Sequence, residues 1–142
     1  MVIRPENLPR RSVDSLLDEA RADIQRHTVQ DTFDYQQQGA LLIDIRPVAQ
    51  RAQYGVIPSA LCIERNVLEW RLDPQSEHRL PDISSYQRRV IIVCQQGYAS
   101  SFAAASLRLL GYEQVGDVMG GFDAWRSAGL PTLAFEPKLS AA

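Results

Sequence analysis

Apolar residues are grouped along this chain in two different ways. They form short, nearly unbroken runs at 40–45, 60–63 and 90–94, which is typical of strands buried on both faces of a sheet. They also recur every three or four residues over 13–26, which predicts an amphipathic helix, and they almost encircle a second predicted helix at 99–111. Strands and helices are therefore expected to alternate.

This alternation predicts a single α/β domain with a parallel sheet, since strands of this kind need helices on both faces. Shorter helices are predicted at 31–38 and 47–53, a short strand near 114–119, and a last helix that ends at Gly129. Residues 66–86 mix a helical turn with prolines and polar residues and are predicted to form a long surface excursion. The length of 142 residues matches one domain.

Composition and charge argue against several classes of partner. The net charge is −2, and the arginine pairs at 10–11 and 88–89 are isolated, so no nucleic-acid partner is expected. No apolar segment is long enough to span a membrane, and no apolar run follows the arginines near the N-terminus. We therefore expect no membrane partner, no secretory signal and a cytoplasmic location.

The two cysteines, Cys62 and Cys94, predict no cofactor site. They belong to no CxxC motif and have no companion histidine pair, so neither a zinc site nor a disulfide framework is expected, and no metal or other cofactor. Cys62 lies in a predicted strand and is expected to fill the core. The histidines, His27 and His78, are expected to be surface residues.

Residues able to do chemistry follow three of the predicted strands. Asp44 ends the first, Glu64 and Arg65 follow the second, and Cys94 ends the third. Because ligands bind outside the carboxyl ends of the strands in such sheets, these side chains are expected to converge. Position alone leaves Cys94 equally well explained as a small buried hydrophobe or as a reactive thiol.

The segment after Cys94 favours the reactive thiol. Gly97 permits a tight curve, and the N–H groups of a curled loop point inward, where the helix that begins near Ser100 adds partial positive charge. An anion is favoured there, so Cys94 is expected to act as a nucleophilic thiolate. The backbone N–H groups expected to bind the anion are those of Gln95, Gln96, Gly97, Tyr98, Ala99 and Ser100.

Four segments follow one another in the order and spacing of a known family. They are LIDIRP at 42–47, GVIPSALCI at 55–63, VCQQGYASSFAAASLRLLGY at 93–112 and VMGGFDAWRSAGLP at 118–131. The chain thereby resembles the single-domain rhodaneses, a family of sulfurtransferases, over residues 28–132. This resemblance implies a rhodanese-like, mostly parallel five-stranded sheet with helices on both faces. It leaves 1–27 as an N-terminal helical extension and 133–142 as a C-terminal tail.

The resemblance also implies an activity. Cys94 is expected to accept sulfane sulfur from thiosulfate or a persulfide, to hold it as a Cys94 persulfide, and to pass it to a thiol, cyanide-like or protein acceptor. The alternative is a sulfur-relay or docking module with little turnover. The helix at 13–26 lies outside the family core, and its apolar stripe either packs on the domain or forms the face of a homodimer.

Two positions affect the choice of substrate, one that differs from the phosphatases of this fold and one that departs from the family pattern. Phosphatases of this fold carry an arginine where this chain has Ser100, so phosphatase activity is not expected. Many single-domain rhodaneses carry an arginine in place of Ala99, and that charge helps to bind the donor. Its absence predicts either poor use of thiosulfate or a substitute charge from Arg65 or Arg71. The alternative is that these two arginines are solvated or salt-bridged.

Other residues of the four segments receive supporting roles from the resemblance. Asp44 and Arg46 match the family's Asp-x-Arg and are expected to form a structural ion pair near the loop, with direct proton transfer as the less favoured alternative. The glycines of the last segment are expected to let the chain approach the loop. Ser100, or its neighbour Ser101, is expected to cap the helix and to donate to the sulfur.

Overall fold

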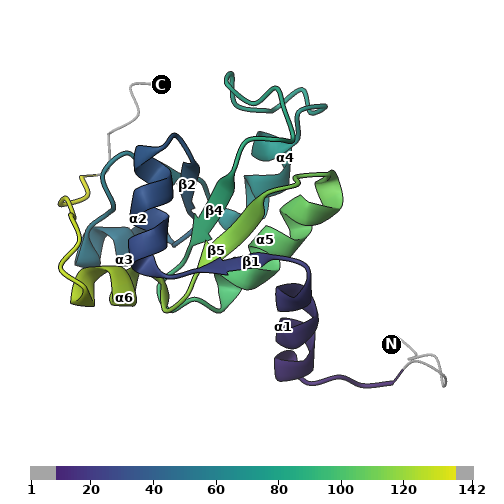
Figure 1. Cartoon of the computed structure of the whole chain (residues 1–142), viewed down its shortest axis with the longest axis horizontal. Helices are drawn as coiled ribbons and strands as arrows, with labels where there is room; N and C mark the ends of the chain where they lie inside the picture. The colour runs from purple at the N-terminus through teal and green to yellow at the C-terminus, as the bar shows by residue number, and fades with distance from the viewer. Residues whose placement is uncertain (1–8, 137–142) are drawn as a thin grey trace.

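The structure, a computed structural model, describes residues 9–136, which fold around a parallel five-stranded sheet (Figure 1). The strands are β1 (Gln25–His27), β2 (Leu41–Asp44), β3 (Leu61–Cys62), β4 (Val90–Val93) and β5 (Val115–Val118). They stand in the order β1-β5-β4-β2-β3, and every neighbouring pair is parallel. The carboxyl ends of the strands therefore lie along one edge of the sheet, where a ligand site is expected.

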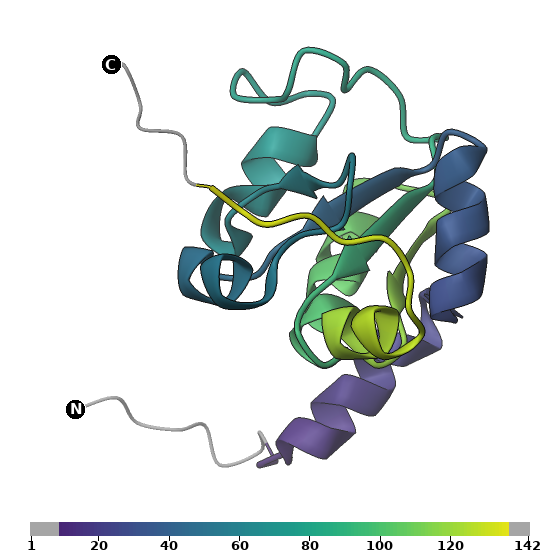
Figure 2. The same ribbon diagram turned by 90° about the vertical axis from the view of Figure 1, so that its left-hand side faces the viewer.

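Six α-helices and one 3-10 helix accompany the sheet within the described residues. They are α1 (Val13–Ala22), α2 (Val29–Gln37), α3 (Val48–Tyr54), η1 (Arg65–Val67), α4 (Leu68–Leu72), α5 (Ala99–Leu110) and α6 (Gly121–Ser127). Buried residues of α4 and α5 pack on one face of the sheet, and those of α6, with partly buried residues of α2, pack on the other. Figure 2 shows α2 and α6 from a second direction. The predicted α/β fold with helices on both faces is confirmed.

The N-terminal region differs from the prediction at its end. The predicted helix at 13–26 is shorter, because α1 ends at Ala22 and the chain then forms β1 at the edge of the sheet. Pairing with β5, which places His27 beside Val118, supplies the hydrogen bonds that residues 25–27 would have made in a helix. His27 is consequently buried, at 7% exposure, and the expectation of a surface histidine was wrong.

The second apolar run forms a shorter strand than its sequence indicates. Only Leu61 and Cys62 pair with β2, as β3 at the other edge of the sheet, and the side chains of both are exposed. The expectation that Cys62 fills the core was therefore wrong, because an edge strand of two residues is not covered on its outer side. Ile63, the next residue, is buried.

No helix within residues 9–136 is long and apolar enough to cross a membrane.

Candidate active site

A cavity of about 690 Å³ opens at the carboxyl ends of β2 and β4. Cys94, directly after β4, lines it together with Arg46, which follows β2, and with residues from α3, η1, α5 and α6. The cysteine is buried, with 7% of its surface exposed. The position of this cavity agrees with the rule that ligands bind where parallel strands end.

The segment from Cys94 to the start of α5, which we call the Cys94 loop (residues 94–100), directs backbone N–H groups at the sulfur. The N–H of Gly97 donates to Sγ at 3.2 Å and that of Ser100 at 3.3 Å. The loop turns at Gly97, whose φ of +87° lies in the left-handed region, and a Cβ there would lie 2.8 Å from the nitrogen of Gly120. Two of the six predicted donors thus contact Sγ, and together with the start of α5 they favour negative charge on it.

The start of α6 fixes the first residues of the Cys94 loop. The N–H of Phe122 donates to the carbonyl oxygen of Cys94 at 2.8 Å, and that of Asp123 to the carbonyl oxygen of Gln95 at 3.0 Å. Gly121 makes this approach feasible, since a Cβ on it would lie 2.5 Å from the Cys94 oxygen. The backbone of the loop is therefore bonded to a second element before any ligand binds.

Arg46 connects β2 to the same loop from a buried position. It forms an ion pair with Asp44, with Nη2 and Oδ2 2.8 Å apart, and both side chains are almost fully buried. Its Nη1 donates to Oε1 of Gln95 at 3.0 Å, and its guanidinium lies 4.0 Å from the centroid of the Phe122 ring. The geometry is that of a structural anchor, because the guanidinium is engaged by the protein on several sides.

Arg65 and Arg71, the two arginines expected to replace the charge that is missing at Ala99, lie in different surroundings. Arg65 lines the cavity, where it also donates to both carboxylate oxygens of Glu69, at 2.8 and 3.0 Å. Arg71 does not line it, and its guanidinium donates instead to the carbonyl oxygen of His78 at 2.8 Å. Of the pair, only Arg65 is in reach of a ligand in the cavity.

Arg126 of α6 also lines the cavity, and the sequence analysis did not single it out. Its guanidinium lies 5.0 Å from the centroid of the Tyr54 ring and 3.7 Å from a carboxylate oxygen of Asp123. The available signal was its place in the last of the four segments, five residues after Gly121, which approaches the Cys94 loop. Tyr98 lines the cavity at its rim and is exposed, with 59% of its surface accessible.

A second group of residues missed from the sequence lies behind the Cys94 loop. The hydroxyls of Ser100 and Ser101 both donate to Oδ2 of Asp117, each at 2.7 Å, so the expectation that one of them caps α5 was wrong. Ser100 does donate to the sulfur, as expected, but through its backbone N–H. Arg26 of β1 and Arg21 of α1 each donate to the Gly97 carbonyl oxygen at 2.9 Å. The one sequence signal was Asp117 itself, an acid inside the apolar strand β5.

Cys62 lies outside the cavity, although it is the more exposed of the two thiols. Loss of hydration raises the pKa of the Cys62 thiol above its ordinary value, and the nearby Asp44 carboxylate adds to the rise. Cys62 therefore stays protonated at neutral pH, and a protonated thiol is a poor nucleophile. The chemistry of the cavity is left to Cys94.

Comparison with known proteins relates this site to a family. Residues 25–128 match the family model described as Rhodanese-like domain. The thiosulfate sulfurtransferase GlpE of Actinobacillus succinogenes is 34% identical over 96 residues, which cover 68% of this chain and 78% of that protein. A sulfurtransferase of Allochromatium vinosum is 38% identical over 96 residues, covering 68% of this chain and 80% of that protein.

A solved structure is similar over nearly the whole chain. It is a protein of unknown function from Rhodopseudomonas palustris, described as a possible tyrosine phosphatase, with 30% identity and a TM-score of 0.79. The similarity covers 92% of this chain and 99% of that one. The family match at 25–128 contains all five strands and the Cys94 loop, whereas α1 precedes it.

Proposed function

This chain belongs to the rhodanese-like family, and we propose that it is a sulfurtransferase that carries sulfane sulfur as a persulfide on Cys94. The observation that carries the proposal is the pair of backbone N–H groups, of Gly97 and Ser100, that converge on Sγ at 3.2 and 3.3 Å. A thiolate and a persulfide both place an anion there, and hydrogen bonds to an ionised acceptor are the stronger ones.

The proposed reaction has two balanced steps. The Cys94 thiolate attacks the sulfane sulfur of the donor; with thiosulfate, the S–S bond breaks, sulfite leaves with the bonding electron pair, and Cys94 carries Sγ–S⁻. A thiolate or cyanide then attacks the outer sulfur, and the Cys94 thiolate leaves. The covalent intermediate divides one transfer into two displacements. In each, the loop N–H groups stabilise the anion on Cys94, which is the thiolate before sulfur is accepted and the persulfide afterwards.

The residues that line the cavity support an anionic donor, and they favour no single class of acceptor. Arg65 and Arg126 bring guanidinium groups to the cavity wall, each also paired with a carboxylate, whereas Ala99 brings no charge. We propose thiosulfate or a small persulfide as donor and a thiol, a cyanide-like nucleophile or a protein as acceptor. The reaction needs Cys94 reduced, which suits a reducing compartment such as the cytoplasm.

Phosphoryl transfer, suggested by the description of the Rhodopseudomonas protein, is not supported for this chain. The position of the phosphatase arginine is Ser100, whose N–H binds Sγ and whose hydroxyl binds Asp117. A serine held in this way does not provide the bidentate guanidinium that a doubly charged phosphoryl group requires.

Turnover of thiosulfate and cyanide to sulfite and thiocyanate tests the proposal. Cys94→Ser is expected to lower thiocyanate production at least about 10³-fold, because the nucleophile is lost. Cys62→Ser, the matched control, is expected to keep the activity, and p-nitrophenyl phosphate is expected to stay intact. Thiocyanate production that survives in Cys94→Ser would refute the proposal.

A further inference from the structure

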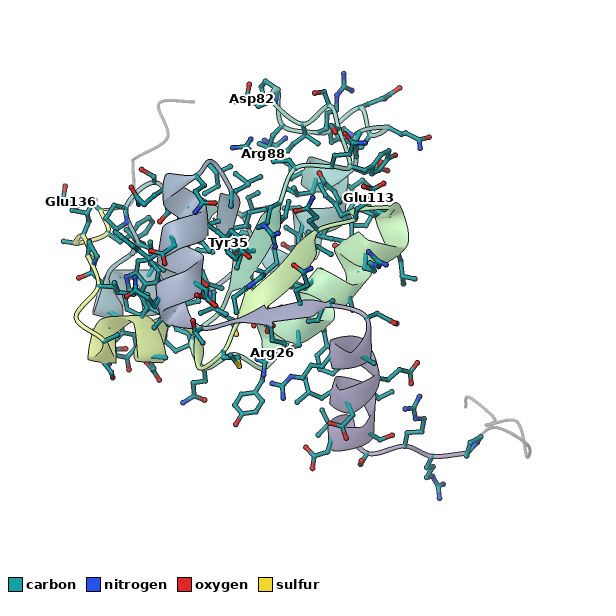
Figure 3. The ribbon with its side chains drawn as sticks, in the orientation of Figure 1. Arg26, Tyr35, Asp82, Arg88, Glu113 and Glu136 are labelled. Atoms are coloured by element: carbon teal, nitrogen blue, oxygen red, sulfur yellow. The ribbon has the colours of Figure 1, made fainter. Side chains whose placement is uncertain are left out.

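We propose that Arg21 and Arg26 are positioning residues that supply, from behind the Cys94 loop, the positive charge that Ala99 does not. The inference rests on the proposed function, because its consequence is a better stabilised anion on Cys94. Neither arginine lines the cavity. Figure 3 shows Arg26 on β1, close to α1, the helix that holds Arg21.

Both guanidinium groups bind one backbone oxygen. Nη2 of Arg21 and Nη2 of Arg26 each donate to the carbonyl oxygen of Gly97 at 2.9 Å. In a trans peptide the C=O and the following N–H point in opposite directions, and the described chain has no cis peptide bond. A Gly97 carbonyl directed outward therefore turns the N–H of Tyr98 to the inner side of the loop. The two arginines thereby fix the orientation of the peptide group between Gly97 and Tyr98. This group follows directly after the Gly97 N–H that donates to Sγ.

The positive charge behind the loop exceeds the negative charge there. Arg26 forms an ion pair with Asp117, with Nε and Oδ1 3.0 Å apart, and the Asp117 side chain is fully buried. Arg21 donates from Nε to the Ser101 hydroxyl at 3.0 Å, and within residues 9–136 it forms no salt bridge. Two guanidinium groups and one carboxylate leave one positive charge against the Gly97 carbonyl. In partly dehydrated surroundings this charge favours an anion in the loop.

Arg21 reaches the loop because α1 packs on the domain. Leu17 of α1 is buried, and α1 contacts α5, whose first turn completes the Cys94 loop. The Arg21 guanidinium also lies 5.7 Å from the centroid of the Tyr98 ring at the rim of the cavity. Because α1 precedes the family match at 25–128, this charge is brought to the site by a segment outside the family region.

The pH dependence of Cys94 alkylation tests this inference. Cys62→Ser serves as the parent, since it leaves Cys94 as the only thiol. Arg21→Gln is compared with Arg11→Gln, a matched control just before α1 whose guanidinium pairs with Glu19. The rate of iodoacetamide alkylation is followed by intact mass over a pH series. Arg21→Gln is expected to move the midpoint of this profile by about half a pH unit to the alkaline side, and Arg11→Gln to leave it in place.

An unchanged midpoint in folded Arg21→Gln, or an equal shift in Arg11→Gln, would overturn the inference. Circular dichroism establishes that each variant is folded, and Arg26→Gln, with the same expected direction, replaces Arg21→Gln if the latter does not fold. A merely structural role would lower stability without moving the midpoint. Alkylation does not depend on sulfur transfer. If Arg21→Gln shows the expected shift but the parent never accepts sulfur from a donor, the proposed function is refuted and this inference stands.

Discussion

At the scale of single residues, the backbone conformation and close packing of Gly97 leave no room for a side chain within the Cys94 loop. Its φ is +87°, and a Cβ would lie 2.8 Å from the nitrogen of Gly120 and 3.0 Å from the oxygen of Val118. Gly97→Ala is expected to cost about 2 kcal/mol in the free energy of unfolding and to lower sulfur transfer at least about tenfold, because the loop must shift. Urea unfolding and thiocyanate production measure the two effects.

Gly39→Ala is the control for this substitution. Gly39 also has a positive φ, of +101°, but a Cβ there would meet nothing within 4 Å. The change is expected to cost only about 1 kcal/mol of backbone strain and to leave sulfur transfer unchanged. Equal losses of activity in the two variants would contradict the role given to the close approach at Gly97.

His27 makes stability depend on pH. Burial and the nearby Arg89 lower its pKa below 6.5, although Asp31 and Asp117 oppose the shift. Its Nε2 has no hydrogen-bond partner in the described part of the chain. The unfolded chain therefore binds the proton more readily, so stability is full above about pH 6.5 and falls as the pH drops below it. Urea unfolding is expected to show a smaller acid loss for His27→Gln, and an undiminished one for the exposed His78→Gln.

At the scale of elements, the consecutive helices η1 and α4 place one arginine in the cavity wall and the other outside it. Arg65 in η1 lines the cavity, whereas Arg71 in α4 points to the His78 carbonyl. Arg65→Met is expected to raise KM for thiosulfate about threefold to tenfold with little change in kcat, because a charge beside the anion is lost. Arg71→Met is expected to match the wild type. Steady-state kinetics that show equal KM values for both variants would remove Arg65 from donor binding.

The elements that the sequence predicted well are those whose pattern is local. β4 and α5 follow from an unbroken apolar run and a nearly encircling one, and the glycine between them predicts the turn of the Cys94 loop. The sequence analysis missed β1 and made β3 too long. Edge strands of two or three residues are defined by the strand they pair with, which the local sequence does not show. The same reason explains why His27 is buried although a surface residue was expected, and why Cys62 is exposed although a core residue was expected.

At the scale of the whole molecule, the strand order determines what the sequence could reveal about the site. Cys94, Gly97 and Arg46 were identifiable, since each lies in a local motif at the end of a strand. The group formed by Arg21, Arg26 and Asp117 was not, because residues some 90 positions apart meet only when β1 pairs with β5. Long-range assembly of this kind leaves no periodicity in the sequence, so the support behind the loop emerged only from the fold.

The most direct test of the central claim is sulfur uptake by Cys94. The reduced protein is incubated with thiosulfate or with a persulfide donor, and its intact mass and the mass of the peptide that contains Cys94 are measured. The account predicts a gain of one sulfur atom on Cys94, removed by cyanide, with no gain in Cys94→Ser and a full gain in Cys62→Ser. A wild-type protein that gains no sulfur from either donor, or gains it equally in Cys94→Ser, would contradict the account.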